Sequence, residues 1–184
     1  AAGMGADVTV FDVDVARMRY IDEVWGGRIG TRFSSPLAVR EACGESDVVI
    51  GSVLVPGART PHLVDHETVL GMVPGSVLVD IAVDQGGCFE DSHPTTHADP
   101  TFVVGGSVFY CVANMPGAVP HTSTYALTNA TMRYVLLLAD EGWRGACGSR
   151  GDLRCGLATC GGKLLSVPVG EALGIECVPV SEVL

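Results

Sequence analysis

Three polar side chains follow apolar, strand-like runs of the sequence: Asp12 after VTVF, Asp84 after VLVDIAV, and Asn114 after SVFYCVA. A carboxylate at the end of a buried strand can accept hydrogen bonds from both hydroxyls of an adenosine ribose, and it repels a 2′-phosphate. Asp84 is followed by two glycines, which allow a tight turn or a close approach of backbone to a ligand. Asp12 therefore predicts a site that prefers NAD to NADP, and Asp84 predicts a carboxylate at a cleft.

The spacing in front of Asp12 is unusual for such a site. A ribose-binding acid ordinarily lies about 20 residues after a G-x-G-x-x-G turn, which follows the first strand and opens a helix. Only eleven residues precede Asp12, and AAGMGA resembles the last turn of a helix. We expect the sequence to begin one strand and one phosphate loop late.

Alternating strand and helix signals extend from Val8 to Asn114. Strands are predicted at residues 8–12, 28–33, 46–55, 74–83 and 107–114. Helices are predicted at 15–24, at 36–43 with Ser34 or Ser35 as its cap, at 66–73, and at about 120–140. Continuous apolar strands of this kind are typical of parallel sheets covered on both faces. The pattern predicts an α/β fold, a Rossmann-type doubly wound parallel sheet that lacks its first strand and phosphate loop.

Ligands of open parallel sheets bind beyond the carboxyl ends of the strands, so the candidate site is read from those ends. The strand-end residues are Asp12, Ser34, Val53 with Leu54, Asp84, and Asn114 with Met115. Strand ends are also polar simply because the chain reaches the surface there. Arg17 has three open interpretations: stacking on adenine, pairing with Asp12, or a solvated helix position.

Composition and charge exclude several other classes of function. The 184 residues are 47% hydrophobic, enough for a buried core, and no apolar run reaches the ~18 residues that span a bilayer. No secretory leader is apparent, so we expect a soluble cytoplasmic protein without a membrane partner. The net charge of −10 and the scattered Lys and Arg residues argue against nucleic acid as a partner.

The seven cysteines do not follow a metal or redox pattern. None forms a C-x-x-C pair, and an odd number argues against a closed disulfide framework. We expect reduced thiols and no metal site, although the four cysteines in the last 38 residues could gather round a metal. Thr122, Ser123 and Thr124, at the start of the predicted helix 120–140, are expected to act as helix caps.

Three stretches carry a family resemblance: VLVPGART, VDIAVDQGGCFEDSHPTTHADPTF and VFYCVANMPGAVPHTSTYALTNAT. They resemble the corresponding stretches of bacterial NAD-dependent alanine dehydrogenase, and the resemblance extends from Ala1 to about Trp143. The same superfamily includes the nucleotide-binding subunit of proton-translocating transhydrogenase and saccharopine-forming enzymes. The resemblance implies oxidative deamination of L-alanine to pyruvate and ammonia with NAD, the reverse amination, and a homo-oligomer, in this family a hexamer.

The resemblance also implies roles for individual residues. Asp12 matches the acid that binds the adenosine ribose, while Arg17 and Ser34 match residues near the adenine. Asp84 matches the catalytic acid. The remaining matches line the dinucleotide crevice and its nicotinamide and substrate side: Val53, Leu54, Ile81, Asn114 and Met115, with Asn114 also on the substrate. His93 and His97 receive no role and are interpreted as loop residues.

The departures from the family define two alternatives. The N-terminal Arg, Lys and His that hold substrate and transfer protons in the family have no match here, and after Gly145 only fragments of the pattern remain. We expect a partial NAD-binding domain at 1–119, followed at 120–184 by the C-terminal part of the substrate domain, with SVPVGEALG as a short helix. The chain is then a truncated alanine dehydrogenase that is inactive alone, or a non-catalytic remnant that binds a nucleotide or oligomerises.

Overall fold

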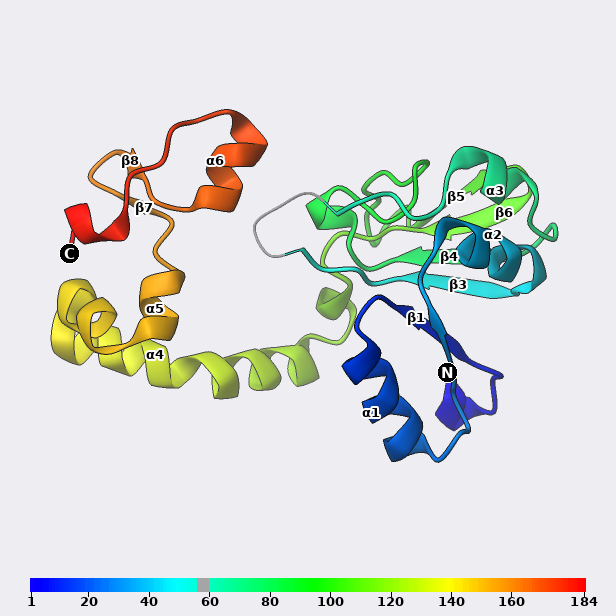
Figure 1. Cartoon of the computed structure of the whole chain (residues 1–184), viewed down its shortest axis with the longest axis horizontal. Helices are drawn as coiled ribbons and strands as arrows, with labels where there is room; N and C mark the ends of the chain where they lie inside the picture. The colour runs from blue at the N-terminus through cyan, green and yellow to red at the C-terminus, as the bar shows by residue number, and fades with distance from the viewer. Residues whose placement is uncertain (56–59) are drawn as a thin grey trace. The chain divides into compact units, whose positions relative to one another are not determined.

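The computed structural model describes residues 1–55 and 60–184, and the chain divides into two compact units (Figure 1). Unit 1 comprises Ala1–Val53 and Pro61–Val112, and unit 2 comprises Leu54–Thr60 and Ala113–Leu184. Among the described helices, none combines the length and the apolar character needed to cross a bilayer. The predicted domain boundary between residues 119 and 120 stays a prediction.

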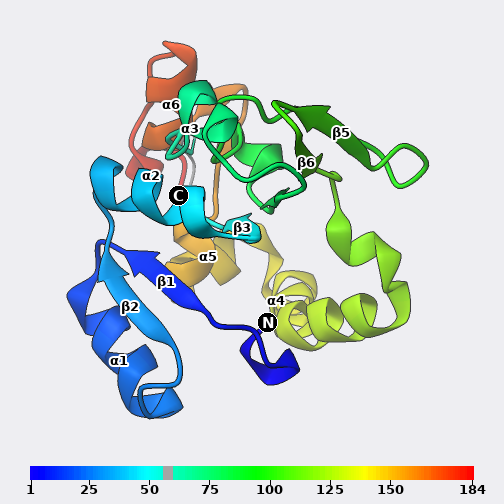
Figure 2. The same ribbon diagram turned by 90° about the vertical axis from the view of Figure 1, so that its right-hand side faces the viewer.

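Unit 1 begins with a β-α-β segment. Its elements are η1 (Ala2–Met4), β1 (Thr9–Asp12), α1 (Val15–Trp25) and β2 (Gly30–Phe33). The carboxylate of Asp14 caps α1 by accepting hydrogen bonds from the backbone N–H groups of Ala16 and Arg17. Gly26 ends the helix in the left-handed conformation. α1 connects β1 to β2, which pair in parallel (Figure 2), as a helical crossover permits.

A second sheet of unit 1 has the strand order β3-β4-β6-β5. Its strands are β3 (Val48–Gly51), β4 (Val77–Asp80), β5 (Thr101–Val104) and β6 (Ser107–Tyr110). The first three in this order are parallel, and β5 is antiparallel to β6. The predicted α/β class with a Rossmann-type parallel sheet is confirmed, and within unit 1 the backbone hydrogen bonds divide the strands into the pair β1-β2 and the four-stranded sheet.

The strands of the second sheet are shorter than the apolar runs from which they were predicted. The predicted strand 74–83 ends at Asp80, because the Asp80 carboxylate accepts a hydrogen bond from the N–H of Ala82 and turns the chain. The predicted strand 107–114 ends at Tyr110, and the backbone reaches the left-handed region at Asn114 (φ 59°). The apolar residues beyond each strand end therefore belong to turns.

The core lies against one face of the second sheet. Leu78 and Phe109 are adjacent on this face and completely buried. Helices α2 (Pro36–Glu45) and α3 (His66–Leu70) contribute Cys43 and Val69 to the same cluster, and both lie on one side of the sheet in Figure 1. Ser35 caps α2, as one of the two predicted alternatives.

The opposite face of this sheet stays open in the part of the chain that the structure describes. Val48 and Ile50 of β3 are each 53% exposed, and Val103 of β5 is 65% exposed. The predicted covering of both faces of the sheet therefore stays a prediction for this face.

Unit 2 is largely helical. Its elements are η3 (Met115–Ala118), α4 (Pro120–Ser149), α5 (Gly151–Cys155), β7 (Thr159–Cys160), β8 (Lys163–Leu164), α6 (Val167–Leu173) and η4 (Val180–Glu182). Gly142 (φ 68°, ψ 165°) interrupts α4, so the helix predicted to end near Asp140 continues after a break. The predicted short helix in SVPVGEALG is present as α6.

Candidate functional site

Asp12 and Ser34 meet at the carboxyl end of the β1–β2 pair. Asp12 is the last residue of β1 and is half-buried, and Ser34 directly follows β2. The backbone N–H of Ser34 donates to the carbonyl oxygen of Asp12 at 2.9 Å. The Asp12 carboxylate accepts from the backbone N–H of Asp14 at 2.9 Å, which orients it at the strand end. The two predicted ribose-side and adenine-side residues are thus neighbours.

Arg17 lies on the first turn of α1 and is exposed. Its guanidinium carbon is 5.9 Å from the centre of the Tyr20 ring on the same helix, a cation–π distance. Exposure of Arg17 is compatible with a solvated helix position and with stacking on adenine, so these interpretations stay open. The side chain remains within a few residues of Asp12 and keeps its charge at the surface.

Asp84 lies on a single turn of 3-10 helix, η2 (Val83–Gln85), beyond the end of β4. The sequence predicted that a strand delivers this carboxylate directly, but β4 ends at Asp80 and a turn carries the chain onward. Ile81 holds the start of this turn, because its N–H donates to the carbonyl oxygen of Gly51 on β3 at 2.8 Å. Asp84 is exposed, as a residue that meets a ligand needs to be.

Sequence reasoning missed Asp80, the most enclosed acid of the chain. Its side chain is completely buried and accepts three hydrogen bonds. The donors are the backbone N–H of Ala82 at 3.0 Å, the backbone N–H of Cys88 at 2.8 Å and the hydroxyl of Ser92 at 2.5 Å. The sequence signal that could have identified it is an acid within the apolar run VLVDIAV. An acid in a buried strand needs hydrogen-bond donors around it, so its position predicts a local network of such donors.

Gly87, the second glycine after Asp84, lies against the carboxylate of Asp80. Gly87 has φ +82°, and a Cβ placed there would lie 2.9 Å from the Asp80 carboxylate and 2.9 Å from Cβ of Ser92. Gly87 therefore allows a close approach of the backbone to Asp80, and the tight turn predicted for the two glycines is present. Gly51 faces the same region, because its Cβ would lie 2.7 Å from Cβ of Cys88.

Three buried cysteines, Cys43, Cys88 and Cys111, belong to the hydrophobic core of unit 1. Burial raises the pKa of Cys43 to about 11. Burial also raises the pKa of Cys88 and of Cys111, and the charge of Asp80 raises both further. Thiols of this kind are protonated and unreactive at neutral pH. All seven cysteines of the chain are free.

The remaining predicted residues are distributed over both units. Val53 is half-buried against the core of unit 1, whereas Ile81 is 54% exposed. Leu54, 63% exposed, belongs to unit 2. Asn114 and Met115 open η3 of unit 2, with Asn114 exposed and Met115 half-buried.

The hydroxyl groups at the start of α4 do not cap the helix. The cap position is Val119, which has no side-chain hydrogen bond, and the prediction for Thr122, Ser123 and Thr124 is wrong. Ser123 instead donates its hydroxyl proton to the carbonyl oxygen of Pro116 at 2.8 Å. It thereby ties α4 to η3, the segment that carries Asn114 and Met115.

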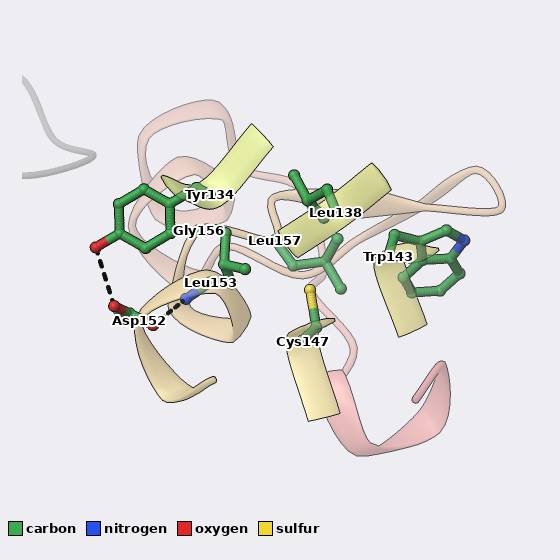
Figure 3. A pocket seen from close by; sticks show the side chains of 8 residues that line it. All are labelled: Tyr134, Leu138, Trp143, Cys147, Asp152, Leu153, Gly156 and Leu157. Atoms are coloured by element: carbon green, nitrogen blue, oxygen red, sulfur yellow. Dashed lines mark hydrogen bonds between the residues drawn. The ribbon is translucent and has the colours of Figure 1, made fainter. Parts of the chain in front are cut away.

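A cavity of about 440 Å³ lies within unit 2 (Figure 3). Its lining is mainly apolar and includes Leu138, Trp143, Cys147 and Leu157. At one side Tyr134 donates its hydroxyl proton to the carboxylate of Asp152 at 3.0 Å, and hydrogen bonds from Arg150 hold the pKa of Asp152 far below its usual range. No residue predicted for the dinucleotide site lines this cavity.

Comparisons with known proteins place this geometry in a family. The family model Alanine dehydrogenase/PNT, C-terminal domain matches residues 1–167. The alanine dehydrogenase of Mycolicibacterium smegmatis is 59% identical over all 184 residues. This chain belongs to the alanine dehydrogenase family. The resemblance inferred from the motifs around Asp84 and Asn114 is thereby confirmed.

Other alanine dehydrogenases and two solved structures are also similar to this chain. The alanine dehydrogenases of Mycobacterium tuberculosis and Halomonas elongata are 56% and 52% identical over 184 residues. A structure of L-alanine dehydrogenase matches 94% of this chain with a TM-score of 0.82 and 44% identity. A transhydrogenase structure from Sinorhizobium meliloti matches 77% with a TM-score of 0.62 and 27% identity. The chain spans about half the length of the curated alanine dehydrogenases it matches.

Proposed function

We propose that this chain forms the nucleotide-binding half of an NAD-dependent alanine dehydrogenase. The enzyme converts L-alanine, NAD and water to pyruvate, ammonia and NADH. The observation that carries the proposal is 59% identity over every residue of the chain to an alanine dehydrogenase. The positions of Asp12 at the end of β1 and of Asp84 beyond the end of β4 support it, because dinucleotides bind at that edge of a parallel sheet.

The residues at the end of β1 fit the adenosine part of NAD. The half-buried Asp12 carboxylate can accept hydrogen bonds from ribose hydroxyls and repels the 2′-phosphate of NADP. Ser34 and the exposed cation of Arg17 are assigned to the adenine side, and Val53, Leu54 and Ile81 to the crevice wall. NAD, when bound, accepts the hydride that leaves the α-carbon of alanine.

Asp84 is the proposed acid–base group of the reaction. Water must lose a proton when it attacks the oxidised substrate, and the leaving ammonia must gain one. An exposed carboxylate on a short, anchored turn can accept and return these protons. Asn114 is assigned to the substrate and Met115 to the nicotinamide side.

The test uses a complete enzyme, defined here as these 184 residues joined behind the N-terminal half of the M. smegmatis relative. We expect NADH formation at 340 nm with L-alanine and NAD at alkaline pH, and little with NADP. L-Serine and glycine serve as control substrates. A folded complete enzyme without alanine-dependent NADH formation would contradict the proposal and favour the non-catalytic remnant.

The proposal extends to the assembly and its location. As in the family, we propose a homo-oligomer, a hexamer, that acts in the cytoplasm on L-alanine and pyruvate. Light scattering of the complete enzyme measures the assembly directly. A monomeric active enzyme would refute the proposed hexamer and leave the reaction standing.

A further inference from the structure

A completely buried carboxylate lies four residues before the proposed acid–base group. Asp80 ends β4 on the buried face of the second sheet, opposite Gly51 of β3. The reaction proposed above gives Asp80 no direct role, since its side chain is 0% exposed. An isolated buried charge is costly unless it is matched by hydrogen bonds, so its partners indicate what it does.

The partners of Asp80 come from both sides of Asp84. Oδ1 accepts from the N–H of Ala82, two residues before Asp84, at 3.0 Å. Oδ2 accepts from the N–H of Cys88, four residues after Asp84, at 2.8 Å, and from the hydroxyl of Ser92 at 2.5 Å. One carboxylate therefore fastens the segment that enters the Asp84 turn and the segment that leaves it.

The packing around this carboxylate leaves the turn little freedom. Gly87 approaches Asp80 so closely that any Cβ would lie 2.9 Å from Oδ2. The N–H groups of Gln85 and Gly87 both donate to the carbonyl oxygen of Ala82, at 2.8 and 3.1 Å, which closes the turn on itself. The backbone that carries Asp84 is thus fixed at both ends and in its middle.

We propose that Asp80 is a positioning residue for Asp84, and this inference rests on the proposed function. Each oxygen of the carboxylate accepts from a backbone N–H group, so an amide in its place would present its own N–H to at least one of these donors. Asp80 fixes the backbone of residues 82–88, and this backbone directs the Asp84 carboxylate toward the substrate. Loss of the bonds displaces Asp84 without removing it.

The first test compares kcat with KM in the complete enzyme. Asp80→Asn keeps the side-chain shape but faces at least one N–H or O–H donor with its own amide. Because a displacement of about 1 Å can cost ~10²-fold in rate, we expect kcat to fall about 10- to 100-fold. The KM for NAD should change less than about threefold, because Asp12 lies at another strand end. A fall in folded fraction alone, with kcat per folded enzyme unchanged, would overturn the proposal.

Ser92→Ala is the milder variant in case Asp80→Asn does not fold. It removes one of the three hydrogen bonds and should lower kcat by a smaller factor in the same direction. Ser76→Ala is the matched control, because the Ser76 hydroxyl is also buried and donates to the carbonyl oxygen of Val73, in the turn before β4. Equal effects of Ser92→Ala and Ser76→Ala on kcat would overturn the proposal.

A double-mutant cycle separates positioning from general damage. If Asp80 acts through Asp84, Asp80→Asn should lower kcat no further in an enzyme that already carries Asp84→Asn. Losses that multiply would instead show that the two residues act independently, and would overturn the proposal.

Amide hydrogen exchange tests the inference without activity. In the complete enzyme, Ser92→Ala should accelerate exchange at residues 82–88 more than in β3, and Ser76→Ala should not. Unchanged exchange at 82–88 would overturn the positioning role even in an active enzyme. An inactive wild-type enzyme with the expected exchange pattern would contradict the proposed reaction, and with it the catalytic purpose of the positioning, while showing that Asp80 fixes the backbone of residues 82–88.

Discussion

Asp12 is the residue on which cofactor preference depends. We expect Asp12→Gly in the complete enzyme to weaken NADH binding about 10- to 100-fold, because hydrogen bonds to a charged group contribute about 1.5–3 kcal/mol. NADPH binding should weaken less or improve, since the repulsion of its phosphate is lost. Fluorescence titration measures both. Asp7→Gly, which removes an exposed acid before β1, is the control, and equal affinities of the unmutated enzyme for NADH and NADPH would refute the assignment.

Asp84 carries the proposed proton transfers. Asp84→Asn should lower kcat about 10²- to 10⁴-fold, the usual contribution of a positioned acid or base, and should change NADH affinity much less. Steady-state kinetics with L-alanine and NADH titration give the two quantities. Unchanged turnover with unchanged alanine affinity would assign Asp84 a structural role only.

At the scale of elements, the turn after β4 requires glycine at position 87, because of its backbone conformation and its close neighbours. Gly87→Ala adds a Cβ 2.9 Å from Asp80 at a backbone with φ +82°. The conformation alone costs about 1–2 kcal/mol, and the close contact adds to it. Gly75→Ala is the matched control, because Gly75 also has positive φ (+94°) but open space around it.

Urea unfolding measures the free energy of unfolding of both variants. Their difference separates the cost of the close contact with Asp80 from the cost of a positive φ, which both variants share. We expect Gly87→Ala to be destabilised by roughly 1 kcal/mol or more beyond Gly75→Ala. A smaller loss in Gly87→Ala than in Gly75→Ala would show that the turn gives way and that Asp80 is not tightly enclosed.

Helices α1 and α2, which begin at a side-chain cap, could be predicted from short stretches of sequence. The helices after Asp14 and Ser35 start where their side chains accept backbone N–H groups, so short-range sequence was sufficient. The strand β5 was missed although Gly105 and Gly106, both with positive φ, form a two-residue hairpin turn between TFVV and SVFY. Asp80 was missed because its role depends on Ser92, twelve residues away, and such a contact has no local pattern.

At the scale of the whole molecule, the chain spans about half of its relatives, and this sets what it does alone. We expect the purified 184 residues to show no measurable alanine deamination and weak NADH binding. Holding the substrate in a reactive pose supplies ~7–11 kcal/mol of the barrier, and in the family the clamps lie in the other half. An assay at 340 nm with saturating L-alanine and NAD compares the chain with the complete enzyme. Robust activity of the chain alone would contradict this expectation.

The buried thiol of Cys43 makes unit 1 sensitive to alkali. Below pH 9 this thiol is protonated in both the folded and the unfolded chain. Between pH 9 and about 11 the unfolded chain releases its proton first, because the folded pKa is raised to about 11. The free energy of unfolding should therefore fall as pH rises through this interval, by about 2–3 kcal/mol at most. Urea unfolding at pH 8 and pH 10.5 measures the loss, and Cys43→Ala should reduce its pH dependence.

This sensitivity bears on the direction of the proposed reaction. Oxidation of alanine by NAD releases a proton, so alkaline solution draws it toward pyruvate. The same condition is expected to weaken the core beneath the sheet whose strand β4 precedes Asp84. We expect the enzyme's half-life in storage to shorten above pH 9 while its initial rate of alanine oxidation still rises, so that prolonged alkaline turnover is limited by survival of the fold.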